Sequence, residues 1–119
     1  MIKIADALNA LSVNEWTLTG EPSNETEFNS MFKKIIGIDA DERSILSEDP
    51  NDFGVTWSQV KIKYDELQAD YDAKQYQRDR AVAYPSIQDQ LDMQYWDSIN
   101  GTTTWADAIT TVKQEHPKP

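Results

Sequence analysis

The organisation of the C-terminal half depends on one stretch of sequence, Arg80-Ala81-Val82-Ala83-Tyr84-Pro85-Ser86-Ile87-Gln88-Asp89-Gln90-Leu91-Asp92. Proline disfavours helical backbone in the residue before it, so a helix arriving at this stretch should end at Tyr84. Ser86, with Asp89 three residues later, is a typical start for a new helix. The stretch therefore predicts a corner between two helices.

The helix before this corner has a clear beginning. Thr56 and Gln59 have the spacing of a capping box, and Val55 and Val60 that of a hydrophobic staple. No Gly or Pro follows until Pro85, so the sequence predicts one long helix over residues 57–84.

The long helix carries two apolar stripes. The first consists of Trp57, Val60, Tyr64, Leu67 and Tyr71, and the second of Ile62, Ala69, Ala73, Tyr76 and Ala83. One stripe can cover the protein's own core, and the second can contact another subunit or the C-terminal helices. The alternative that both stripes are intramolecular stays open.

Two short helices are expected after the corner, at about residues 87–99 and 105–115. The apolar positions of the first are Ile87, Leu91, Tyr95, Trp96 and Ile99. Asn100-Gly101 is a typical C-terminal stop, and Thr104 with Asp107 is a candidate cap for the final helix. We expect the corner at Tyr84-Pro85-Ser86 to fold both helices back towards the long one.

The N-terminal half predicts a small sheet. A first helix is expected around Ile4–Leu11, followed by a strand at Glu15–Thr19. Residues 26–36 fit either a helix or a short helical turn that continues into a strand. We favour a hairpin around Asp39–Glu42, which completes a three-stranded antiparallel sheet. The expected class is α+β, with an N-terminal part at residues 1–55 and a helical part at residues 56–119 forming one structural unit.

Composition narrows the classes of partner. The formal net charge of −10 opposes binding to nucleic acid and to anionic membrane surfaces. The chain has no cysteine, no apolar run of membrane-spanning length and no signal-peptide pattern near its first residue, so we expect synthesis in the cytoplasm. Hydrophobic residues make up only 39%, which predicts a thin core completed by a partner or by self-association.

No arrangement of residues predicts catalysis, a cofactor or a metal. The single histidine, His116, lies close to the end of the chain, where a catalytic base would be poorly held. The acidic turn at Asp39–Glu42 departs from a calcium loop, because Arg43 and Ser44 occupy the fifth and sixth positions. The four tryptophans fit packing better than a sugar site. The expectation is a protein that is not an enzyme.

The segment Tyr64–Ala81 followed by Tyr84-Pro85-Ser86-Ile87-Gln88-Asp89-Gln90-Leu91-Asp92-Met93 resembles a signature of small tail-associated proteins of tailed bacteriophages, common in marine phages. The upstream Val55–Lys61 and the ending at Ala108–Lys113 with Pro117-Lys118-Pro119 are also similar, so the likeness covers roughly residues 53–119. The sequence departs from the group at Gln88, where its members usually have Gly. The resemblance implies a virion structural, baseplate, tail-fibre or tail-assembly protein.

On that interpretation, the protein is made in the host cytoplasm and acts in the tail region of the virion through protein–protein contacts. Its partners would be other phage tail proteins or further copies of itself. The residues proposed for these contacts are Tyr64, Leu67, Tyr71, Tyr76, Tyr95 and Trp96.

An alternative function follows from the charge. An acidic host-takeover protein could imitate DNA and bind a basic host protein, if its acids lined up along one elongated face. The acids that would form this face are Asp65, Glu66, Asp70, Asp72 and Asp79. A lytic enzyme is a third hypothesis, and no residue pattern supports it.

Overall fold

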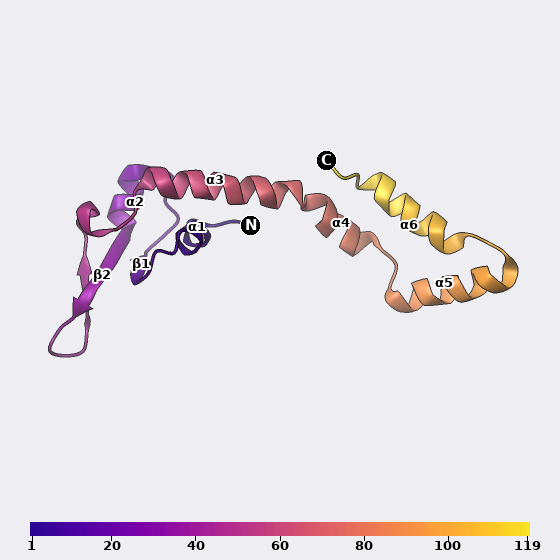
Figure 1. Ribbon diagram of the computed structural model, residues 1–119, viewed down its shortest axis with the longest axis horizontal. Helices are drawn as coiled ribbons and strands as arrows, with labels where there is room; N and C mark the ends of the chain where they lie inside the picture. Colours follow the sequence, from indigo (N-terminus) through magenta and orange to yellow (C-terminus); the bar gives the residue numbers. More distant parts are fainter. The chain divides into compact units, whose positions relative to one another are not determined.

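The computed structural model describes all 119 residues (Figure 1). Its elements are α1 (Ile4–Ala10), β1 (Trp16–Leu18), α2 (Glu25–Met31), β2 (Phe32–Ile38), β3 (Ser44–Ser47), a 3₁₀ turn (Pro50–Asp52), α3 (Trp57–Ala73), α4 (Gln75–Ala83), α5 (Ile87–Asn100) and α6 (Thr104–Glu115). The α+β class predicted from the sequence is confirmed.

The chain forms two compact units, which we call unit 1 (Met1–Tyr71) and unit 2 (Asp72–Pro119). The sequence interpretation placed a division at residues 55 and 56 inside one structural unit, whereas the structure has two compact units that divide between Tyr71 and Asp72. The difference arises because the N-terminal part of α3 supplies core residues to unit 1. Val60 is fully buried there, and Trp57 packs against the same cluster.

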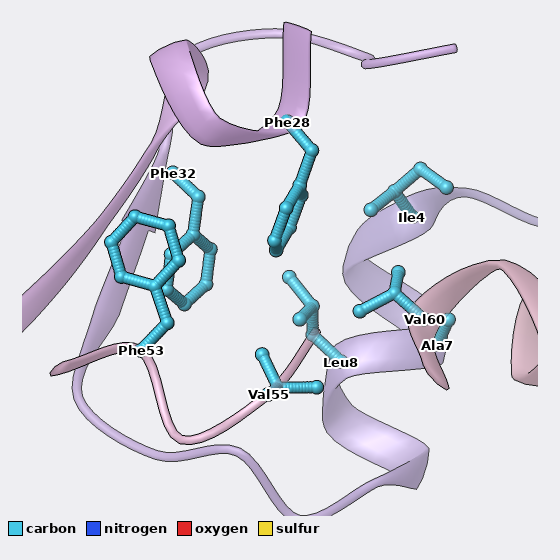
Figure 2. Packing of buried hydrophobic residues seen from close by; sticks show 8 residues of the cluster. All are labelled: Ile4, Ala7, Leu8, Phe28, Phe32, Phe53, Val55 and Val60. Atoms are coloured by element: carbon cyan, nitrogen blue, oxygen red, sulfur yellow. The ribbon is translucent and has the colours of Figure 1, made fainter. Parts of the chain in front are cut away.

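Aromatic side chains dominate the core of unit 1. The rings of Phe28 and Phe32 are stacked with centroids 5.0 Å apart, and Phe53 meets Phe32 edge-on at 4.7 Å. Leu8 and Val60 complete the set of large side chains that are wholly buried. Figure 2 shows this cluster drawn together from α1, α2, the start of β2, the segment before α3 and α3 itself. Unit 1 therefore closes a core of its own.

The sheet of unit 1 has the order β1-β2-β3 and is antiparallel throughout. The ambiguous segment at residues 26–36 is helical up to Met31 and extended from Phe32 onwards. Asn24 begins the helix, because its side chain accepts a hydrogen bond from the backbone N–H of Glu27 at 2.8 Å. The expected hairpin and three-stranded sheet are both confirmed, with a register shift between Ile35 and Gly37.

The predicted long helix is interrupted, which corrects the expectation of one helix over residues 57–84. Its capping box is present, since Thr56 and Gln59 exchange hydrogen bonds of 3.0 and 3.3 Å. The helix breaks at Lys74, whose carbonyl accepts a bond from Gln77 three residues later. Neither Gly nor Pro marks this position. The break follows the last residue of the first apolar stripe, Tyr71, and precedes α4, which contacts α6.

The two short helices lie within one residue of their expected ranges. Ser86 caps α5 by accepting a bond from the backbone N–H of Asp89 at 3.1 Å, as predicted. Gln88, where the resemblance departs, lies in the first turn of α5. The stop at Gly101 is also confirmed, since this residue adopts the left-handed conformation with φ of 67° that suits glycine.

The predicted Thr104–Asp107 cap is wrong. Thr104 is the first residue of α6, and its backbone N–H donates to Asp97 of α5 at 3.0 Å. The cap position belongs to Thr103, whose hydroxyl donates to Asp107 at 3.0 Å. A carboxylate from a neighbouring helix has replaced the local cap, which sequence spacing cannot reveal.

Candidate interaction surface

Arg80 joins α4 to the end of α6 in unit 2. Its Nε donates to the carbonyl of His116 at 2.8 Å, and its Nη2 donates to the carbonyl of Lys113 at 3.3 Å. These acceptors lie at the C-terminal end of α6, where carbonyls lack helical partners and a positive charge is favourable. The guanidinium also lies 5.0 Å from the centre of the Tyr76 ring. Arg80 therefore holds α4 and α6 together.

Gln90 links the corner to the beginning of α6. Its side-chain Nε2 donates to the carbonyl of Pro85 at 2.8 Å, and its Oε1 accepts from the indole N–H of Trp105 at 3.1 Å. Both ends of the amide are thus used. The glutamine has a structural role inside unit 2.

Asp97 makes the densest set of hydrogen bonds in unit 2. Its carboxylate accepts from the hydroxyls of Thr102 and Thr104, both at 2.6 Å, and from the backbone N–H groups of Thr104 and Trp105. The hydrogen bond from the Thr102 hydroxyl, followed by that from Thr104, holds the pKa of Asp97 well below its usual range. The negative charge also lies at the positive end of α6. Asp97 therefore fixes the turn between α5 and α6.

These contacts determine which side of α5 faces inward. Gln90, Met93 and Asp97 are its only half-buried residues, and no residue of α5 is fully buried. Their spacing of three and four residues places them on one stripe of the helix. The inward stripe of α5 is therefore mainly polar.

The apolar side chains of α5 lie on the other side, in contact with solvent. We call this set the α5 apolar face, and its exposed fractions are Ile87 70%, Leu91 59%, Tyr95 59%, Trp96 50% and Ile99 56%. The rings of Tyr95 and Trp96 meet edge-on with centroids 5.1 Å apart. Helix α6 does contact α4, as the predicted corner requires. Tyr95 and Trp96, two of the residues proposed for partner contacts, are therefore exposed, and Gln90 and Asp97 take the inward positions.

The six residues proposed for partner contacts do not form one surface. Tyr64 and Leu67 pack against the core cluster of unit 1, and Tyr71 is half-buried near the end of α3. Tyr76 is half-buried in α4 beside Arg80. Only Tyr95 and Trp96 lie together on an exposed apolar surface.

Three members of the exposed face were missing from the proposed contact set. Sequence spacing assigned Ile87, Leu91 and Ile99 to the apolar side of the helix but did not place them in the proposed contact set. The polar residues on the opposite side of α5 are a sequence signal for the observed arrangement. Gln90 and Asp97, seven residues apart, can reach the corner and the next helix through side-chain hydrogen bonds.

The acids proposed for a DNA-like face include two that pair with lysines of α3. Lys61 and Asp65 form an ion pair of 2.7 Å, and Lys63 and Glu66 one of 2.8 Å. These lysines place positive charge beside the acids of the helix.

Neither unit encloses a pocket, and no three potential metal-ligating side chains gather in one place. None of the helices combines the length and apolar character that crossing a membrane requires. No family model, curated protein or solved structure proves similar to this chain, so the resemblance of its C-terminal half remains a prediction.

Proposed function

We propose that this protein is a non-enzymatic component of the tail region of a bacteriophage, acting through protein–protein contacts in the virion or during tail assembly. The main support for the proposal is the α5 apolar face, in which each of the five large side chains is at least 50% exposed. A contiguous exposed apolar patch on a small protein usually marks a contact with another molecule. The resemblance of the C-terminal half supplies the phage context.

The residues of the stretch that resembles the phage signature have two roles in the structure, which supports this proposal. Arg80, Ser86 and Gln90 hold unit 2 in shape through the hydrogen bonds described above. Ile87 and Leu91 are exposed on the α5 apolar face. A signature of this kind suits a scaffold that presents a fixed surface to a partner.

The acidic alternative has no comparable support. Its proposed face would need an uninterrupted line of negative charge, whereas Asp65 and Glu66 are each paired with a lysine. Contact through the α5 apolar face is therefore the function we favour.

Quantitative mass spectrometry of purified virions and of tail intermediates from infected cells tests the proposal. We expect the protein at a fixed ratio to tail proteins in at least one of these fractions. A double variant, Leu91→Ser with Tyr95→Ser, should lower that ratio, whereas Val82→Ser removes an exposed apolar residue outside this face and should leave it unchanged. Presence only in intermediates would identify an assembly factor. Absence from both fractions would refute the proposal.

A further inference from the structure

We propose that the α5 apolar face binds a positively charged amphipathic helix of a partner protein. The inference rests on the proposed function only in assigning this face to protein contact, and it adds the shape and charge of the partner.

The shape of the face indicates a helical partner. Ile87, Leu91, Tyr95 and Ile99 recur every four residues, so they form one continuous ridge along the helix. The 14 residues of α5 extend over about 21 Å, which matches three to four turns of a second helix. Ridges of this kind fit between the matching ridges of another helix, which crosses at an angle of about −50°. Trp96 widens the apolar contact on one side of the ridge.

The charge around the face indicates the sign of the partner. Asp89 and Asp92 are exposed on α5, and neither Lys nor Arg occurs between Ile87 and Val112. Nothing in this segment neutralises these two carboxylates. A partner helix with Lys or Arg beside its apolar residues would place opposite charges at the edge of the contact. An acidic partner would be repelled by the same residues.

The same charges disfavour a second copy of this chain as the occupant. A symmetric pair of α5 helices would pack the same patch on both copies. In an antiparallel pair, the two Asp92 residues would approach each other near the middle of the contact, because Asp92 lies close to the centre of α5. In a parallel pair, Asp89 would face Asp89. Neither arrangement offers a base of α5 to offset the repulsion.

Purified full-length protein and synthetic peptides provide a direct test. The probe is a fluorescently labelled peptide of about 18 residues, with Leu at positions i, i+3, i+4 and i+7 and Lys elsewhere. The first control replaces every Lys with Glu, and the second keeps the Leu and Lys composition but shuffles the order. Fluorescence anisotropy near 0.15 M salt, where the Debye length is about 8 Å, limits long-range attraction to the acidic protein.

Protein variants separate specific docking from general attraction between opposite charges. Leu91→Ser with Tyr95→Ser leaves the net charge unchanged and should weaken binding of the Lys peptide more than about tenfold. Asp89→Asn with Asp92→Asn should weaken it about three- to tenfold, because two exposed charge pairs are lost. Asp41→Asn with Glu42→Gln removes the same charge from the hairpin loop of unit 1 and should change the affinity less than about twofold. Circular dichroism confirms that each variant folds.

The expected result is tight binding of the ordered Lys peptide, weaker binding of the shuffled peptide and none of the Glu peptide. Equal binding of the ordered and shuffled peptides would overturn the inference, and so would failure of the Leu91 and Tyr95 changes to weaken binding. Sedimentation showing a dimer of the protein that these changes dissociate would assign the face to a second copy and also overturn it. None of these outcomes bears on virion association, so the proposed function stands or falls separately.

Discussion

Unit 1 and unit 2 are stabilised in different ways. Unit 1 completely buries five large apolar side chains, whereas Val112 is the one buried residue of unit 2. The helices of unit 2 are joined instead through Arg80, Gln90 and Asp97. Hydrophobic burial needs no particular direction, but hydrogen bonds place their partners specifically. Unit 2 is thereby held in a defined shape while most of the apolar surface of α5 remains exposed to solvent.

The largest expected effect comes from removing an aromatic ring of the unit 1 core. Phe28→Ala should lower the free energy of unfolding of unit 1 by about 3–5 kcal/mol, because Phe28 is fully buried against Phe32 and Phe53. Urea denaturation followed by circular dichroism measures the loss. The matched control Tyr95→Ala removes an exposed ring from α5 and should have little effect. Equal losses would contradict the contrast between the two units.

The second effect concerns the arginine that joins α4 and α6. Arg80→Met keeps much of the side-chain length but removes both hydrogen bonds, and should destabilise unit 2 by about 1–3 kcal/mol. Arg80→Lys keeps the charge and should recover part of that loss. Backbone hydrogen exchange in α6 reports the change. Arg43→Met, in the exposed hairpin of unit 1, is the control. If α6 keeps its protection from hydrogen exchange in Arg80→Met, apolar contacts alone are enough to hold α6 in place.

A third effect depends on pH. The pKa of Asp97 is lowered in the folded protein, so its contribution to stability is present above the pKa of the unfolded chain, near 4. The contribution decreases as pH falls towards the lower folded pKa. Asp97→Asn should therefore be less stable than the wild type at pH 7, and the two proteins should converge as pH falls from 5 to 2.

Thermal unfolding of both proteins across this pH range, followed by circular dichroism, measures that convergence. Asp92→Asn removes an exposed carboxylate of the same helix and serves as the control. A constant difference between Asp97→Asn and the wild type at every pH would mean that the Asp97 charge has no part in holding the turn.

The smallest effect is expected on the α5 apolar face. Leu91→Ala should change the free energy of unfolding by less than about 0.5 kcal/mol, because Leu91 is exposed. The same substitution at the buried Leu8 should cost about 2–5 kcal/mol, which makes it the matched comparison. A large loss from Leu91→Ala in the isolated protein would show that this face already has an occupant.

Sequence signals that act within a few residues predicted most of the helix boundaries. They failed where a hydrogen bond joins residues that lie further apart. Thr56 with Gln59, Ser86 and Gly101 act within a few residues, so the sequence identified these helix boundaries correctly. The Asp97 carboxylate accepts hydrogen bonds from residues five to eight positions later, across a turn. A local capping rule cannot detect this, so it predicted Thr104 as the cap of α6. The break at Lys74 has no Gly or Pro to mark it.

The candidate surface shows the same limit. Apolar periodicity identified Ile87, Leu91 and Tyr95 as one side of a helix, because spacing along a helix is a local property. Periodicity does not say whether that side meets the rest of the protein or the solvent. Three of the proposed contact residues, Tyr64, Leu67 and Tyr76, face packing partners inside their own units.

The sequence by itself determined the α+β class, the ends of the two C-terminal helices to within one residue, and the corner at Tyr84-Pro85-Ser86. Backbone restriction by proline, side-chain caps and apolar spacing act over a few residues, and they suffice for these features. Only the tertiary structure decided which face of α5 is exposed. Gln90 and Asp97 find their partners across the corner and the turn, five to eight residues away, and these hydrogen bonds direct the apolar face to solvent.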